Sequence, residues 1–184
     1  MALIYDVPVA FSEAECDALV ALGERVGLVP ATVWAAAGDQ VDEAVRSART
    51  SHHPRGAETG WIYDRLDRLF AEAGEAFGLA VGPVTEPLQI LRYDEGGHFQ
   101  TWHSDAGYDA LERRLVSVSV ELSAPGDHDG GDLEIIPDTV GRRRTLGRGG
   151  ARFFPSRAIH RVSPVTRGVR HALVIWTGGD VSPS

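Results

Sequence analysis

The chain is poor in cysteine, with Cys16 as the only one in 184 residues. An internal disulfide is therefore impossible, and a zinc site built from several thiolates is excluded. The sequence also lacks an apolar run near the roughly 20 residues that a membrane-spanning helix needs. Its first residues, MALIYDVPVAFSEAE, contain no basic segment typical of a secretory signal. We therefore expect a cytoplasmic protein that is not embedded in a membrane.

Positive charge is also in short supply, because 18 basic residues face 26 acidic ones and leave a formal net charge of −8. Such a balance disfavours binding to nucleic acid or to an anionic membrane surface. Hydrophobic residues make up 43% of the chain and charged residues 24%, which is typical of a globular protein. The length suits one domain spanning residues 1–184. The sequence does not indicate an oligomeric state.

The first part of the chain, residues 1–85, has the patterns of a mainly helical support. Ser12 followed by Glu15 forms a capping box, which predicts that a helix begins there. A second helix is predicted over about 61–77, where apolar residues recur at helical spacing. Between the two helices, the stretch RTSHHPRG (49–56) has no steady periodicity, and we expect a loop.

The second part, residues 86–178, changes to short β-like runs that Gly, Pro and Asp clusters separate. Many short strands without intervening helices predict an antiparallel sandwich or barrel. The predicted strands cover 88–94, 114–122, 131–137, 151–155, 159–165 and 170–177.

One of these runs, VSVSVEL (116–122), alternates strictly between apolar and polar residues. Its valines would share one face of the sheet, and Ser117, Ser119 and Glu121 the other. The polar face could meet solvent or line a wet cavity inside a barrel. Alternation alone favours solvent, the usual case in antiparallel sheets.

Four residues suggest a metal site beside an anion site. His103 and Asp105 lie two positions apart, so in an extended segment both side chains point the same way. Alone they would more often form a polar turn, but His160 supplies a third candidate ligand downstream. Two imidazoles and one carboxylate suit non-haem Fe(II), because they leave three coordination positions open. Arg170, ten residues later, opens an apolar strand and needs an anion such as a carboxylate.

From about residue 49 to 177 the sequence resembles the Fe(II)/2-oxoglutarate-dependent dioxygenases, in their prolyl 4-hydroxylase-like branch. The resemblance rests on RTS, LQILRYDEGGHFQTWHSD, GGDLEI and GRGGARFFPSRAIHRVSPVTRGVRH, followed by a strand that carries Trp176. It implies a double-stranded β-helix (jelly-roll, cupin-like) core supported by helices.

The resemblance also implies a role for each matching residue. The implied catalytic residues are His103, Asp105, His160 and Arg170, of which the first three hold Fe(II). The implied co-substrate residues are Arg170, Tyr93, Leu133 and Trp176. The implied substrate-side residues are Trp102, His98 and Arg49.

The implied reaction consumes 2-oxoglutarate and dioxygen, with ascorbate as an optional reductant. It hydroxylates an aliphatic C–H bond of a small molecule or amino-acid-derived substrate and releases succinate and CO2. Two alternatives stay open: a peptidyl-prolyl hydroxylase, and a non-catalytic cupin-like domain that binds a metal or ligand.

The sequence departs from the family pattern at three positions. Ala172 and Val174 stand where many relatives carry a hydroxyl after the arginine. In the register that the resemblance implies, Glu121 stands where some relatives place a tyrosine beside 2-oxoglutarate. Because a carboxylate there would repel a dianion, we expect the Glu121 side chain to be protonated or turned aside, or the assumed register to be shifted.

Overall fold

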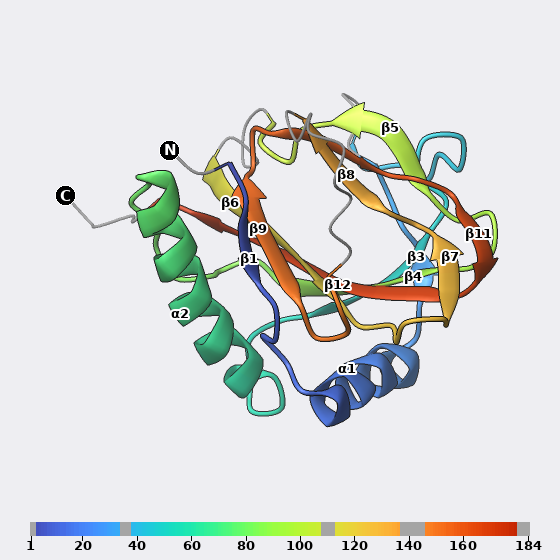
Figure 1. Cartoon of the computed structure of the whole chain (residues 1–184), viewed down its shortest axis with the longest axis horizontal. Coiled ribbons are helices and arrows are strands. Elements are labelled where there is room, and N and C mark those ends of the chain that lie inside the picture. The colour runs from blue at the N-terminus through green and yellow to red at the C-terminus, as the bar shows by residue number, and fades with distance from the viewer. Residues whose placement is uncertain (1–2, 34–37, 108–112, 137–145, 180–184) are drawn as a thin grey trace.

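A computed structural model describes residues 3–33, 38–107, 113–136 and 146–179 (Figure 1). The two helices are α1 (Glu13–Val26) and α2 (Gly60–Phe77). The strands are β1 (Tyr5–Val7), β2 (Val29–Pro30), β3 (Arg49–His53), β4 (Leu88–Tyr93), β5 (Phe99–His103), β6 (Arg114–Glu121), β7 (His128–Gly130), β8 (Leu133–Ile136), β9 (Ala151–Pro155), β10 (Ile159–Val162), β11 (Val165–Gly168) and β12 (Arg170–Gly178).

The strands form one large sheet and two small ones. The large sheet has the order β1-β9-β6-β12-β4-β3-β2, and the small sheets have the orders β5-β10-β8 and β11-β7. Every pairing is antiparallel. Figure 1 shows the small sheets facing one side of the large sheet, while α1 and α2 cover its other side. This arrangement is the predicted double-stranded β-helix core supported by helices.

The helices begin and end where the sequence predicts. The Ser12 hydroxyl accepts a hydrogen bond from the Glu15 amide, and the Glu15 carboxylate accepts one from the Ser12 amide, which completes the capping box. The second helix ends at Gly78, whose φ of 67° is a left-handed conformation that glycine adopts without a steric penalty.

The first 85 residues contribute more than helices, and here the sequence-based picture was incomplete. Strands β1, β2 and β3 extend the large sheet on both of its edges. The stretch predicted as a loop, RTSHHPRG, begins with β3, which pairs with β4 along its whole length. Its residues alternate between two faces of the sheet without being strongly apolar, so hydrophobic periodicity could not reveal the strand.

The preference for a solvent-facing polar side of 116–122 was wrong. Val116, Val118 and Val120 pack into the core that the helices cover. Ser117, Ser119 and Glu121 point to the other side, between the sheets, where Ser117 is only 1% exposed. The strand therefore has a dry face toward the helices and a polar face toward the barrel interior.

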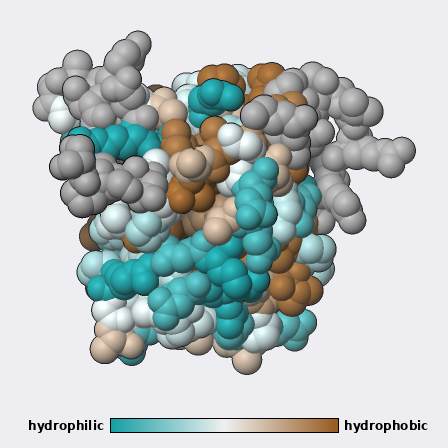
Figure 2. Space-filling view, turned by 90° about the vertical axis from the view of Figure 1, so that its left-hand side faces the viewer, coloured by the Kyte–Doolittle hydropathy of each residue, from teal (hydrophilic) through white to brown (hydrophobic). Residues whose placement is uncertain are grey.

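The main hydrophobic core lies between the helices and the large sheet. It includes Leu66 and Phe70 of α2 and Phe153 of β9, all at most 1% exposed. The outward side of α2 carries ion pairs such as Arg68–Glu72, and the view from this side of the molecule shows a mainly hydrophilic band (Figure 2). Within the described part of the chain, no helix is long and apolar enough to cross a membrane.

Candidate metal centre and its cavity

Two histidines face each other across a strand pair. His103 ends β5 and His160 lies on β10, and the register makes them direct partners with ring centroids 4.3 Å apart. The Nδ1 of His103 lies 2.8 Å from the Thr101 carbonyl, and that of His160 lies 2.9 Å from the Ala158 carbonyl. Because a carbonyl only accepts, each Nδ1 carries a proton. The Nε2 atoms are therefore the ones that can bind a metal.

Asp105 follows β5 and is held in place by three kinds of contact. Its amide donates to the carbonyl of Ser156. Its Oδ2 accepts a hydrogen bond from the Ser117 hydroxyl at 2.7 Å and lies 3.4 Å from Nε2 of His160. The Ser117 hydroxyl also contacts the hydroxyl of Ser156, which is fully buried. A buried network of this kind fixes the carboxylate before any ligand arrives.

The charges in this group suit a cation. Burial, with the charge of His160, lowers the pKa of His103 to about 4, so this imidazole is neutral near pH 7. Burial alone would raise the pKa of Asp105, but His160 and hydrogen bonds from His160, Trp176 and Ser117 hold it well below its ordinary range. Burial alone would lower the pKa of His160, yet the Asp105 carboxylate raises it.

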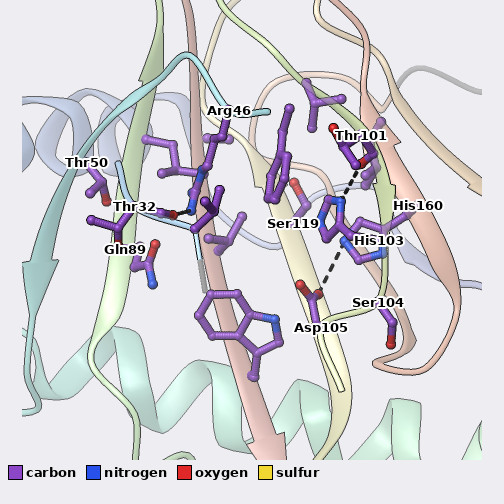
Figure 3. A pocket seen from close by; sticks show the side chains of 18 of the residues that line it. Thr32, Arg46, Thr50, Gln89, Thr101, His103, Ser104, Asp105, Ser119 and His160 are labelled. Atoms are coloured by element: carbon purple, nitrogen blue, oxygen red, sulfur yellow. Dashed lines mark hydrogen bonds and ion pairs between the residues drawn. The ribbon is translucent and has the colours of Figure 1, made fainter. Parts of the chain in front are cut away.

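The three side chains can meet at one ion. Their ligand atoms all lie within 4.8 Å of one another. Figure 3 shows the side chains of His103, Asp105 and His160 grouped on one side of the cavity. Two oriented imidazoles and one carboxylate are the protein ligands of many non-haem Fe(II) sites, and the three residues fit that set. The structure thus brings together all three residues that the sequence singled out as metal ligands.

A cavity of about 470 Å³ opens beside this group, within the usual range for small-molecule sites. All four residues implied for the co-substrate line it: Tyr93, Leu133, Arg170 and Trp176. Tyr93 and Arg170 are direct partners across β4 and β12, and the guanidinium carbon lies 5.6 Å from the phenol centroid. Trp176 lies at the other end of β12, beside Asp105.

Arg170 is buried, at 4% exposure, and its guanidinium is only partly occupied. Its Nε donates to Glu121 Oε2 at 2.9 Å. Within the described residues, its two Nη atoms have no hydrogen-bond partner, so both are free to bind a carboxylate in the cavity. The charge of Arg170 overcomes the effect of burial and lowers the pKa of Glu121, which is therefore ionised.

Glu121 is thus turned aside, one of the outcomes that the sequence left open. It pairs with the edge of the guanidinium and does not line the cavity. Ser119, two residues earlier on β6, lines the cavity instead.

The three substrate-side candidates lie elsewhere. Arg49 is exposed and donates to the Leu28 carbonyl. Trp102 is 41% exposed on the outer face of β5, under the guanidinium of Arg161. Neither of them lines the cavity, and nor does His98, whose backbone pairs with Ser47. The alternation along β3 and β5 sends these side chains away from the cavity.

The cavity wall opposite His103, Asp105 and His160 holds polar residues that the sequence did not reveal. Arg46, Thr50 and Gln89, here called the polar wall, come from the segment before β3, from β3 and from β4 (Figure 3). A strand assignment for 49–53 would have pointed Thr50 inward, but nothing in the sequence marks Arg46 among its 18 basic residues.

Comparison with known proteins supports this picture. A model of the 2OG-Fe(II) oxygenase superfamily matches residues 88–178. A PKHD-type hydroxylase of Paraburkholderia phymatum is 31% identical over 186 residues, covering 95% of this chain and 78% of that protein. A PKHD-type hydroxylase of Hyphomonas neptunium is 40% identical over 146 residues, covering 76% of this chain. This chain spans 64% of the Hyphomonas protein and 57% of a similar one from Delftia acidovorans.

Solved structures show the same fold. A prolyl-4-hydroxylase of Pseudomonas putida superposes with a TM-score of 0.76 at 22% identity, covering 96% of this chain and 92% of that one. The viral collagen prolyl hydroxylase of Paramecium bursaria Chlorella virus-1, solved with 2-oxoglutarate, gives 0.70 at 21% identity, covering 97% of each chain. Together with the match over the jelly-roll core and the long alignment to the Paraburkholderia protein, these findings show that the chain belongs to the 2OG-Fe(II) oxygenase superfamily.

Proposed function

We propose that the protein is a non-haem Fe(II)- and 2-oxoglutarate-dependent dioxygenase that hydroxylates an aliphatic C–H bond. One oxygen atom of O2 enters the product as a hydroxyl, and the other enters the succinate that forms as 2-oxoglutarate loses CO2. The observation that carries the proposal is one cavity that holds both a two-histidine, one-carboxylate group and a buried arginine whose Nη atoms have no hydrogen-bond partner among the described residues.

In this proposal each group of residues in the cavity has its own binding role. His103, Asp105 and His160 hold the iron, which, when bound with 2-oxoglutarate, supplies the activation of dioxygen. Arg170 binds the distal carboxylate of 2-oxoglutarate through its Nη atoms, and Tyr93 donates its phenol to the same group. Leu133 and Trp176 enclose the co-substrate and keep water away from it.

For the substrate, we propose a small molecule or an amino-acid-derived compound. The cavity volume and the polar wall support a compact substrate with polar groups. A second candidate is peptidyl proline, because the structural relatives from Pseudomonas putida and the Chlorella virus are prolyl hydroxylases.

The first test is an anaerobic titration of the metal-free protein with Fe(II) and then 2-oxoglutarate. We expect the weak visible charge-transfer band of a keto acid chelated to iron. Asp105→Ala should lose the band, because it removes the only carboxylate of the metal group. Asp64→Ala, which changes an exposed aspartate on α2, should keep it. A band of full strength in Asp105→Ala would refute the ligand assignment.

Turnover separates an enzyme from a binding domain. Under air, the iron-loaded protein should release succinate from 2-oxoglutarate, slowly without substrate and faster with it. A protein that gives the charge-transfer band but never releases succinate would instead be a non-catalytic metal- and ligand-binding domain.

A further inference from the structure

The polar wall carries the positive charge of Arg46, which forms no ion pair with any residue that the structure describes. Arg46 lines the cavity, and its Nη1 donates to the Thr32 carbonyl at 3.0 Å. Among the described residues that line the cavity, the carboxylates are Asp39 and Asp105, and neither forms an ion pair with Arg46. After burial, the charge of Arg46 also lowers the pKa of His52, another residue that lines the cavity.

Two buried polar atoms of this wall lack a partner. In the described part of the chain, three buried side-chain nitrogen or oxygen atoms have no hydrogen bond. Two of them, Nε of Arg46 and Oγ1 of Thr50, belong to the polar wall. Buried polar atoms are normally paired, by protein, water or ligand. The third member, Gln89, has no side-chain hydrogen bond to the described residues, so its amide is also available.

The position of Arg46 is fixed, so its charge sits at a defined place in the cavity. The next residue, Ser47, forms a backbone bridge with His98. The guanidinium carbon of Arg46 lies 5.0 Å from the ring centroid of Phe99, and the Phe99 ring stacks on His103 at 3.7 Å. One aromatic ring therefore separates the guanidinium from a metal ligand. Figure 3 shows Arg46, Thr50 and Gln89 on one side of the cavity and the metal ligands on the other.

We propose that the substrate carries a carboxylate and that the polar wall binds it. Arg46 supplies the charge, while the Thr50 hydroxyl and the Gln89 amide donate hydrogen bonds. A guanidinium prefers a carboxylate as its partner, and a fixed one positions it. In the sheet register, Gln89 lies opposite Val174, whereas Arg170 begins β12 opposite Tyr93, so the two positive groups take different positions in the cavity. The inference rests on the proposed function and narrows its substrate class to small carboxylic acids, of which free amino acids are the simplest.

The test uses the full chain loaded anaerobically with Zn(II) and 2-oxoglutarate, so that binding is measured without turnover. The probes are the common amino acids, each as the free acid and as the primary amide, together with a blocked prolyl peptide without a carboxylate. Binding is read by calorimetry. The variants are Arg46→Gln and Arg46→Lys, with Arg25→Gln as a control that removes an exposed arginine of α1.

We expect at least one free acid to bind, and its amide to bind tenfold more weakly or worse. Arg46→Gln should weaken binding of that acid by about tenfold to a hundredfold, the loss of a charge-assisted hydrogen bond. Arg46→Lys should recover part of the affinity, and Arg25→Gln should match the wild type. Binding of 2-oxoglutarate itself should not change in Arg46→Gln, which separates this site from a general loss of structure.

Three outcomes would overturn the inference: no acid of the panel binds, an acid and its amide bind equally well, or the blocked peptide binds equally well with and without the Arg46 side chain. Each is distinct from a failure of the proposed function. If the wild type bound no 2-oxoglutarate in the presence of metal, the oxygenase assignment itself would fall.

Discussion

Replacing Glu121 with glutamine should have opposite effects on stability and on co-substrate binding. Glu121 Oε2 accepts a hydrogen bond from Arg170 Nε at 2.9 Å, and both side chains are largely buried. Glutamine can keep the hydrogen bond but removes the negative charge. Arg170 would then lose the carboxylate that forms its ion pair in the described structure, until 2-oxoglutarate arrives.

The magnitude follows from the geometry of the guanidinium. A carboxylate docked on the two Nη atoms would lie roughly 6–7 Å from the Glu121 carboxylate, across the planar fork. At an effective dielectric constant of about 20, two such charges repel by roughly 2–3 kcal/mol. Removing this repulsion should tighten 2-oxoglutarate binding by roughly 30- to 150-fold. Without the co-substrate, the free energy of unfolding should fall by about 1.5–3 kcal/mol.

Two measurements on one protein check this reasoning. Calorimetry with Zn(II)-loaded protein gives the 2-oxoglutarate affinity, and urea unfolding gives the stability with and without the co-substrate. As a control, Glu24→Gln removes an exposed carboxylate that is paired with Arg92, and it should change neither the affinity for 2-oxoglutarate nor the binding of Zn(II). Unchanged or weaker 2-oxoglutarate binding in Glu121→Gln would show that Glu121 does not oppose the co-substrate through Arg170.

Three further predictions concern the site and the scaffold. Arg170→Ala should strongly raise the 2-oxoglutarate concentration that turnover requires and leave Fe(II) binding mostly intact. It should also lower the free energy of unfolding by about 3–5 kcal/mol, because Glu121 becomes a buried charge without its ion-pair partner. Loss of Fe(II) binding with unchanged 2-oxoglutarate affinity would contradict this prediction. Leu66→Ala, at a fully buried site of α2, should lower the free energy of unfolding by about 2–5 kcal/mol in urea titrations. A loss below about 1 kcal/mol would mean that neighbouring side chains fill the cavity that the substitution leaves. Hydrogen bonds from Arg65 lower the pKa of Glu15 to about 2 in the folded state. This pair should therefore contribute stability that is fully present above about pH 4.5 and is lost as the pH falls toward 2. In Glu15→Gln the urea midpoint should fall less steeply over that pH range, and an unchanged slope would exclude the pair as the source of the fall.

The three candidate metal ligands could be singled out from the sequence because part of their geometry, the spacing of His103 and Asp105, is local. A two-residue spacing puts His103 and Asp105 on one side of an extended segment, and the jelly-roll pairing then makes His160 the partner of His103. The helices were predictable for the same reason, since the Ser12 capping box and the stop at Gly78 are local signals.

Other features depend on contacts between distant segments, and the sequence could not supply them. The cavity-facing side of β6 looks like any solvent-facing strand until the small sheets cover it. Strand β3 exists because β4 pairs with it, not because its own residues are strongly β-forming. The place of Arg46 is set by the neighbouring bridge from Ser47 to His98, a contact across 51 positions.

The two faces of β6 have a consequence for protein engineering. The helix-facing valines belong to the hydrophobic core, while Ser119 on the same strand lines the cavity and Ser117 and Glu121 hold Asp105 and Arg170. A library that varies only position 119 would alter the shape and polarity of the cavity and leave the core untouched, because alternate residues on a strand are nearly independent sites. New specificities could therefore be selected at this position at little risk to folding. The same reasoning suggests how members of this superfamily can diverge in substrate while their scaffold stays recognisable.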